Sequence, residues 1–312
     1  MIHTLTMNPA VDMTIRSGGL RPGEVNRTRD SVYDYNGKGV NVARVLRHLG
    51  EETAALGFFG GFSGRFIVDS LRDEGIPVYP IPVEDTTRVN IFLNDGSQEY
   101  KLVGEGARVP PDAQAQLLAL LEELPELQYL TINGSLPPGI GEDFYDSILE
   151  VCRRRGVQVI LDISARRLPR LLGFSPLLIK PNDEEVREIW GMTIAGERDA
   201  VEVLDLLHGQ GARNVLLTLG EKGLYFSDGD GIWYCDAPRV ELVSSACAGD
   251  ACLAAFLSRW LAGAGLEEAL KLASATGGDV AGSAGIGSLS RVTGYLPGLT
   301  VKTVRPGKDK SI

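Results

Sequence analysis

The chain has 312 residues, 44% hydrophobic and 23% charged, with a formal net charge of −10. This composition suits a globular α/β protein of one large domain, and the acidic charge without a Lys/Arg block argues against nucleic-acid binding. No apolar run of about 18 residues and no signal-peptide pattern occurs, so we expect no membrane span and a cytoplasmic protein. Four scattered cysteines and three histidines predict no zinc site.

Apolar runs rich in β-forming residues alternate with helix-like stretches. The predicted strands are Ile2–Met7, Thr53–Phe59, Tyr129–Ile132, Val157–Ile163, Leu177–Ile179 and Val215–Leu219. The predicted helices are Asp112–Leu124, Glu142–Arg155, Ala200–Gly209, Asp250–Ala262 and Glu267–Ala281. This alternation is typical of a doubly wound α/β fold with a mostly parallel sheet. No linker divides the chain, so we predict one domain over residues 1–312, with a frayed tail after Thr303.

Two segments, 12–35 and 88–103, interrupt the alternation of strands and helices. In the second, Asn94-Asp95-Gly96 separates two strand-like runs and is a hairpin signal. We predict a small antiparallel β flap over a site. An edge hairpin without function is the alternative.

The usual nucleotide-binding signatures are absent. The segment Gly37–Val40 lacks the last residue of a P-loop, and the glycines of Gly57–Gly64 do not have dinucleotide-site spacing. The glycines at the start of Asn36–Asn41, ahead of a predicted helix over 42–49, could instead let a ligand approach the backbone. Lys38 and Asn41 could then contact a sugar; a simple turn is the alternative.

Lys180 and Pro181 end a predicted strand, and Asn182 is a good N-cap for the helix that follows. Glu185 stands at its third position, which resembles a capping box. The functional alternative is that Asn182 and Glu185 hold waters around Mg²⁺ at the carboxyl end of the strand.

Three small residues lie at the end of the predicted strand Val215–Leu219 or shortly after it. Thr218, Gly220 and Gly223 could let an adenine or ribose lie against the backbone. A tight hairpin turn explains them equally well.

The stretch SSACAGDACLAAFL places small residues before one carboxylate, Asp250, at the start of a predicted helix. Uncovered N–H groups at a helix start form an anion site. A carboxylate there would repel a phosphate, unless it removes a proton from the group that attacks the phosphate. With an ordinary pKa near 4 it would be ionised at neutral pH. Cys247, which opens the loop, is expected to be buried and inert rather than reactive.

The chain contains, in order, TLTMNPAVDMTI, GEVNRT, NGKGVNVARVLRHLG, TRVN, NGSLPPG, LDISARRL, KPNDEE, TLGEKG and CAGD. In this order, over nearly the whole chain, these segments resemble the PfkB (ribokinase-like) family of carbohydrate kinases. The closest resemblance is to its sugar-phosphate branch, which includes 1-phosphofructokinase, tagatose-6-phosphate kinase and the minor 6-phosphofructokinase. The resemblance implies a three-layer ribokinase-like fold with a small β lid, often paired across a homodimer.

The resemblance also assigns roles to residues. Asp250 would be the general base, with the N–H groups of Cys247, Ala248 and Gly249 as the anion hole. The residues implied for the sugar phosphate are Asp12, Gly37, Lys38, Asn41, Arg88, Asn90 and Ser135. Those implied for ATP are Lys180, Asn182, Thr218, Gly220 and Gly223, with Asn182 and Glu185 organising Mg²⁺ through water.

Three positions depart from the family pattern. Cys247 and Asn36 stand where the family has glycines, and Phe92 replaces a lysine common in 1-phosphofructokinases. The resemblance implies fructose 1-phosphate, phosphorylated at its 6-hydroxyl, as acceptor. The segment around Phe92 resembles the minor 6-phosphofructokinase at least as well, so fructose 6-phosphate or tagatose 6-phosphate, phosphorylated at the 1-hydroxyl, is the alternative. A non-catalytic sugar-phosphate sensor is a further alternative, and a nicotinamide oxidoreductase is disfavoured because its glycine signature is missing.

Overall fold

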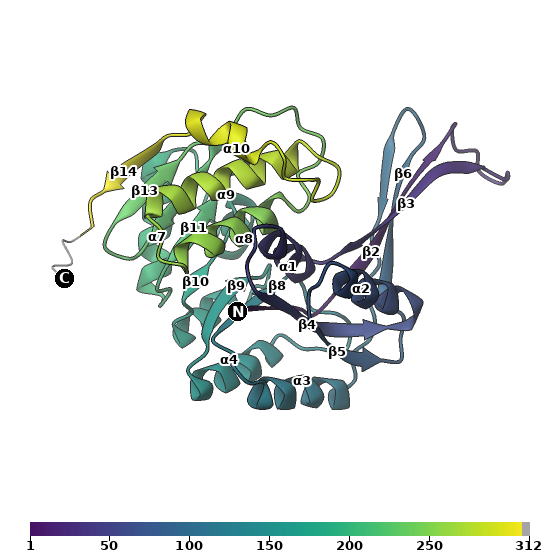
Figure 1. Cartoon of the computed structure of the whole chain (residues 1–312), viewed down its shortest axis with the longest axis horizontal. Helices are drawn as coiled ribbons and strands as arrows, with labels where there is room; N and C mark the ends of the chain where they lie inside the picture. The colour runs from purple at the N-terminus through teal and green to yellow at the C-terminus, as the bar shows by residue number, and fades with distance from the viewer. Residues whose placement is uncertain (308–312) are drawn as a thin grey trace.

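A ten-stranded sheet with helices on both faces forms the centre of the computed structural model, which describes residues 1–307 (Figure 1). The strand order is β14-β13-β12-β11-β10-β9-β8-β1-β4-β5. The parallel strands are β1 (Ile2–Thr6), β4 (Thr53–Gly60), β5 (Val78–Val83), β8 (Tyr129–Asn133), β9 (Gln158–Asp162), β10 (Leu178–Ile179) and β11 (Val215–Thr218). The antiparallel strands are β12 (Leu224–Ser227), β13 (Ile232–Cys235) and β14 (Val301–Arg305). The predicted mostly parallel sheet is confirmed.

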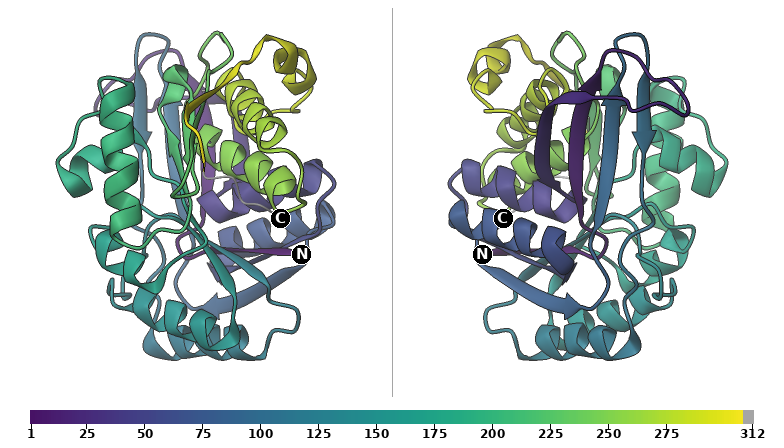
Figure 2. Two further views of the ribbon diagram at one scale, coloured as in Figure 1. Left: turned by 90° about the vertical axis from the view of Figure 1, so that its left-hand side faces the viewer. Right: turned by 90° about the vertical axis from the view of Figure 1, so that its right-hand side faces the viewer.

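Helices cover the sheet in two layers (Figure 2). One layer holds α3 (Pro111–Glu123), α4 (Phe144–Arg155), α6 (Asp183–Trp190) and α7 (Glu197–Gly209). The other holds α1 (Lys38–His48), α2 (Gly61–Asp73), α8 (Ala248–Trp260) and α9 (Leu266–Ala281). Every residue of β1 and β4 is buried, as expected for strands covered on both faces. Short helices complete the chain: α5 (Leu168–Leu171), α10 (Val292–Tyr295) and 3₁₀ turns at Leu172–Phe174, Gly220–Lys222 and Leu296–Gly298.

The two segments predicted as a flap form one four-stranded sheet that extends away from the main body (Figure 1). Its strands are β2 (Ala10–Ser17), β3 (Thr28–Asn36), β6 (Arg88–Asn94) and β7 (Glu99–Leu102), in the order β3-β2-β6-β7. Each segment is an antiparallel hairpin, as predicted, but the hairpins join through a parallel pairing of β2 with β6. We call this sheet the lid sheet.

Two local predictions were wrong. The helix expected over 42–49 begins at Lys38, a full turn earlier, because the glycine-rich turn ends at Gly37. The tail was expected to fray after Thr303, yet β14 continues to Arg305 and pairs with β13. Arg305 also forms a bidentate ion pair with Asp205 at 2.6 and 2.8 Å, which fastens this strand to α7. Lys308 and Lys310, part of that predicted tail, lie outside the described residues.

The described part of the chain contains no helix that is both long and apolar enough to cross a membrane.

Candidate active site

The N-termini of α1 and α8 meet above the carboxyl ends of the central strands. The side chains of Asn41 on α1 and Asp250 on α8 are hydrogen-bonded there at 2.8 Å, although the two residues are 209 positions apart. Within residues 1–307, no hydrogen-bond acceptor is found for the backbone N–H groups of Ala248 and Gly249. The predicted juxtaposition of a carboxylate with free N–H groups is therefore present, and free N–H groups at a helix start favour an anion.

Cys247 is the N-cap of α8 and has a left-handed backbone, with φ 65° and ψ −12°. A side chain in this conformation costs about 1 kcal/mol relative to glycine. Cys247 is therefore less favourable for the stability of the fold than a glycine at this position would be. Its sulfur accepts a hydrogen bond from Asn41 Nδ2 at 3.2 Å. Burial, followed by the nearby charge of Asp250, raises the pKa of the Cys247 thiol to about 12. The half-buried thiol therefore stays protonated and unreactive near neutral pH, as expected.

Asp250 is buried, with 6% of its surface exposed. Burial and the neighbouring Asp162 charge raise the pKa of Asp250 to about 6, against the opposing effects of Lys38, Asn41 and Lys180. The expectation of a pKa near 4 was therefore wrong, because it ignored desolvation. A carboxylate with a pKa of 6 is still about 90% ionised at pH 7, and it is a better proton acceptor than an exposed aspartate.

Two lysines share one buried carboxylate beneath this site. Asp162, at the end of β9, lies 3.1 Å from Lys38 Nζ and 3.1 Å from Lys180 Nζ. Burial alone would raise the pKa of Asp162, but the two ammonium groups outweigh it and hold that pKa below its usual value. Lys180 Nζ also lies 3.4 Å from the point where a Cβ on Gly249 would sit. Asp162 thus holds a cation beside the anion site of α8.

Asp162 was not among the predicted site residues. The signal that could have identified it is a lone carboxylate at the end of a predicted buried strand, in the segment LDIS. Charged side chains are rarely buried unless they are paired or functional.

The carboxylate of Asp12, on β2, is held by two amides. Asn90 Nδ2 donates to one of its oxygens at 2.8 Å and Asn36 Nδ2 donates to the other at 2.5 Å. Gly37 follows with φ 142°, and a Cβ there would come within 2.7 Å of Thr6 Cγ2. The predicted sugar-binding residues Asp12, Gly37, Lys38 and Asn41 are therefore brought to one place.

Arg88, at the start of β6, forms hydrogen bonds only with backbone carbonyl groups within the described residues. Its guanidinium donates to Gly104 at 3.0 Å and to Asn8 at 3.1 Å, and its Nε is buried without a partner. Asn8 Nδ2 lies 3.4 Å from the hydroxyl of Ser135. Asn8 thus contacts Arg88 through its backbone carbonyl and Ser135 through its side chain, and within residues 1–307 the guanidinium of Arg88 forms no ion pair. This suits an anionic ligand.

The capping box predicted at the start of α6 is present. Asn182 Oδ1 accepts from the Glu185 N–H at 2.7 Å, and Glu185 Oε2 accepts from the Asn182 N–H at 3.0 Å. The other Glu185 oxygen accepts from Ser164 and lies 3.6 Å from Lys38 Nζ. The local structural interpretation is therefore confirmed, while the Mg²⁺ role stays a prediction.

The acidic side chains near Lys38 and Lys180 are candidate ligands for a metal ion. Within residues 1–307 no three His, Cys, Asp or Glu side chains gather closely enough to hold a metal by themselves. One oxygen of Asp162, Oδ2, is nevertheless buried without a hydrogen-bond partner. An anionic oxygen left free in this way fits a hydrated Mg²⁺, which keeps several of its waters.

Of the predicted nucleotide residues Thr218, Gly220 and Gly223, Thr218 ends β11 and lies beside the start of α6. Thr218 pairs with Asn182 through a parallel β-bridge. Gly223 has φ 86°, and a Cβ there would come within 2.2 Å of the Cys235 carbonyl oxygen. The hairpin therefore requires this glycine for its own packing. Gly220, with φ 59°, has open space at its Cβ position.

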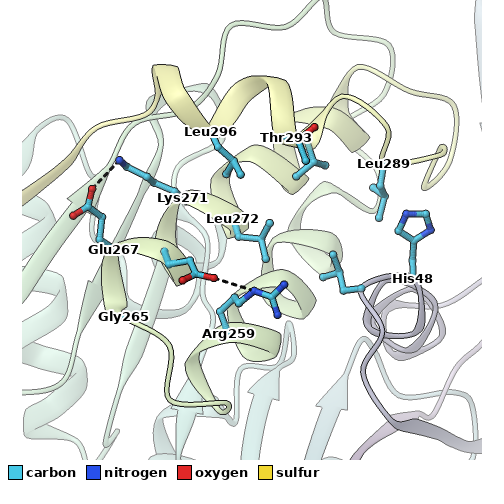
Figure 3. A pocket seen from close by; sticks show the side chains of 12 residues that line it. His48, Arg259, Gly265, Glu267, Lys271, Leu272, Leu289, Thr293 and Leu296 are labelled. Carbon is cyan, nitrogen blue, oxygen red and sulfur yellow. Dashed lines mark ion pairs between the residues drawn. The ribbon is translucent and has the colours of Figure 1, made fainter.

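A hollow lies at the C-terminal ends of α1 and α8, beside α9 and α10 (Figure 3). Its volume is about 830 Å³, and Leu272, Leu289 and Leu296 contribute to its lining. Charged groups at its edge pair with one another: Arg259 with Glu268 at 3.2 Å, and Lys271 with Glu267 at 2.7 Å.

The family model of the pfkB family of carbohydrate kinases matches residues 5–291. The chain belongs to this family. It is 50% identical to a D-tagatose-1-phosphate kinase of Klebsiella oxytoca over 96% of this chain and 99% of that protein. It is 32% identical to a 1-phosphofructokinase of Bacillus subtilis, over 96% of this chain and 99% of that protein.

Solved structures agree with the architecture of this kinase. The phosphofructokinase-2 of Escherichia coli in complex with substrates and products superposes with a TM-score of 0.85 at 28% identity, covering 95% of this chain and 99% of that one. The predicted ribokinase-like fold is therefore confirmed, and the chain is a sugar-phosphate kinase.

Proposed function

We propose that this kinase transfers the γ-phosphoryl group of ATP to the 6-hydroxyl of a ketohexose 1-phosphate. The observation that carries the proposal is the buried carboxylate of Asp250 beside the free N–H groups of α8. D-tagatose 1-phosphate is the first candidate acceptor, because a relative of that specificity is 50% identical over nearly the whole chain. Fructose 1-phosphate, expected from the sequence, is the second candidate, supported by the 1-phosphofructokinases. Fructose 6-phosphate and tagatose 6-phosphate remain alternatives.

Asp250 would act as general base. As the acceptor oxygen attacks the γ-phosphorus, Asp250 takes the hydroxyl proton, the new O–P bond forms and the bond to the β-phosphate oxygen breaks, releasing ADP. Phosphoryl transfer depends mainly on alignment and charge stabilisation. A positioned base contributes about 10²–10⁴-fold.

Positive groups around Asp250 would stabilise the transferred phosphoryl group. The N–H groups of Cys247, Ala248 and Gly249 are fixed at the start of α8, so they need no reorganisation during the reaction. Lys180 adds an ammonium group beside Gly249. Because Asp162 holds this lysine, the cation is in place before ATP binds.

The acceptor would bind between the main body and the lid sheet. Arg88, Asn90 and Ser135 would receive its existing phosphate. Asp12, Lys38 and Asn41 would contact the sugar hydroxyls, with Gly37 allowing close approach of the ring. The buried and unpartnered Oδ1 of Asn41 is available as a hydrogen-bond acceptor.

ATP would lie along α6 and the turn after β11, near Asn182, Thr218 and Gly220. Mg²⁺ would be held through water by Asn182 and Glu185, with Asp162 as an additional anionic group. The ion would supply positive charge to the β- and γ-phosphate oxygens.

The lid sheet would also form a homodimer. Val25, Val32, Tyr33, Leu102 and Val103 on or beside its strands are between 54% and 86% exposed. Exposed apolar side chains on a projecting sheet are candidates for a protein interface. The family resemblance implies that the partner at this surface is the lid sheet of a second copy of the chain.

The proposal is tested by ADP release with Mg·ATP and each of the candidate acceptors, with unphosphorylated tagatose as a control. We expect turnover mainly on a ketohexose 1-phosphate. Asp250→Asn should lower kcat by about 10²–10⁴-fold, whereas Asp69→Asn, an exposed aspartate on α2, should not. Turnover that survives in Asp250→Asn would contradict the assigned base. A folded protein inactive on every acceptor would favour the sensor.

A further inference from the structure

Asn36 and Cys247, two of the positions that depart from the family's glycines, contact each other in space. Asn36 ends β3 and Cys247 caps α8, and their side chains approach to 3.9 Å across 211 residues of sequence. Each glycine-rich loop of the site thus carries extra side-chain atoms, and these atoms face each other. The two departures therefore form one structural unit.

Asn36 links the two carboxylates of the site. Its Nδ2 donates to Asp12 at 2.5 Å, and its Oδ1 accepts from Asn41 Nδ2 at 2.7 Å. Asn41 Nδ2 also lies 2.8 Å from Asp250 and 3.2 Å from the Cys247 sulfur. A continuous set of contacts therefore runs from the predicted sugar-binding carboxylate to the predicted base. A glycine at position 36 would interrupt it.

The amide of Asn36 fixes how Asp12 can meet a sugar. A carboxylate oxygen can accept about two hydrogen bonds, and each Asp12 oxygen already accepts one from Asn36 or Asn90. The remaining acceptor directions are therefore set by the protein. A ring hydroxyl can meet a fixed acceptor in one configuration and not in the opposite one. The side chain of Asn36 also narrows the space beside Asp12.

We propose that Asn36, supported by Cys247, selects the configuration of the acceptor's ring hydroxyls and favours D-tagatose 1-phosphate over its C4 epimer, D-fructose 1-phosphate. Asn36 is a positioning residue, because it acts through the orientation of Asp12 and Asn41. The inference rests on the proposed function and identifies which side chain sets its specificity.

The test compares kcat/KM for the two epimers in the wild type, Asn36→Gly and Asn36→Ala. Both variants remove the amide, but only glycine also frees the backbone. We expect the preference for tagatose 1-phosphate to fall by about tenfold or more in both variants, mainly through KM. Asn94→Ala, an exposed amide on the outer lid sheet, is the matched control and should keep the wild-type preference.

Cys247 variants test the supporting contact. Cys247→Gly should lower the preference for tagatose 1-phosphate less than Asn36→Gly does. If the sulfur atom provides the supporting contact, Cys247→Ala should lower the preference as much as Cys247→Gly. Because the two side chains touch, the double variant Asn36→Gly/Cys247→Gly should lose little more than Asn36→Gly alone.

Calorimetric binding of both epimers to the Asp250→Asn protein, with and without Asn36→Gly, gives the same comparison without turnover. A preference unchanged within about twofold in both assays would overturn the inference, even if the wild type is an active ketohexose-1-phosphate kinase. A wild type that prefers fructose 1-phosphate would overturn it too. Absence of turnover and of binding for both epimers would instead contradict the proposed function, and the inference would fail with it.

Discussion

The two ends of the helix pair α1 and α8 differ in how deeply their charged side chains are buried. At the N-terminal end Asp162 and Asp250 are buried, and their pKa values move in opposite directions. At the C-terminal end, around the hollow of Figure 3, Arg259 and Glu268 pair at the surface, with 35% and 63% of their side chains exposed. Buried charge is costly, and groups with strongly shifted pKa values gather at functional sites. The comparison supports the N-terminal end of the pair as the proposed active site.

Removing the buried anion beneath the lysines is expected to have the largest effect on stability. Asp162→Asn would leave the ammonium group of Lys180 buried beside Gly249 without its counter-charge. Breaking one side of a buried ion pair typically costs about 3–5 kcal/mol. Urea unfolding at neutral pH measures this loss. A variant as stable as the wild type would show that the pairing of Asp162 with Lys38 and Lys180 does not stabilise the fold.

A smaller effect of opposite sign is expected for Asp250→Asn. Burial raises the pKa of Asp250 in the folded protein, so the unfolded chain ionises first as pH rises from about 4 to 6. The native state therefore carries the full cost of the buried charge only above about pH 6. Asp250→Asn should raise the free energy of unfolding by about 1–3 kcal/mol at about pH 8, and by much less at about pH 4.5.

Chemical denaturation at the two pH values gives this difference directly. Equal stabilisation at both values, or a loss of stability at the higher one, would argue that Asp250 is not desolvated in the way the structure indicates.

The smallest effect is expected at the opposite end of the helices. Glu268→Gln removes the exposed partner of Arg259, and exposed ion pairs contribute roughly 0–1 kcal/mol. We expect unchanged kcat/KM and a nearly unchanged free energy of unfolding. A clear loss of activity would show that the hollow at this end is coupled to the proposed active site and would weaken the contrast between the two ends.

Much of this molecule follows from local patterns in the sequence. The six predicted parallel strands are present, because fully buried strands appear as continuous apolar runs, as in Thr53–Gly60. The capping box of Asn182 and Glu185 was also visible, since it depends on residues three positions apart. By contrast, α2 was not predicted; it begins at Gly61 and has a second glycine, Gly64, in its first turn, and glycine is a weak helix former.

Features that depend on distant contacts could not be predicted. The pKa of Asp250 depends on burial and on Asp162, whose strand lies far away in sequence. The contact between Asn36 and Cys247 joins loops 211 residues apart. The strand β14 has few apolar residues and forms because β13 offers it a free edge. Sequence patterns identify such residues singly, whereas the fold determines how they meet.

The pH dependence of kcat/KM tests the central claim most directly. ADP formation from Mg·ATP and the preferred acceptor should be measured from about pH 5 to 8.5, with acceptor ionisation controlled by titration. If Asp250 is the base, activity should fall about tenfold per pH unit below a pKa of about 6, as the carboxylate is protonated. Asp250→Asn should show low activity without this limb. The same acidic limb in Asp250→Asn would contradict the assignment of Asp250 as the catalytic base.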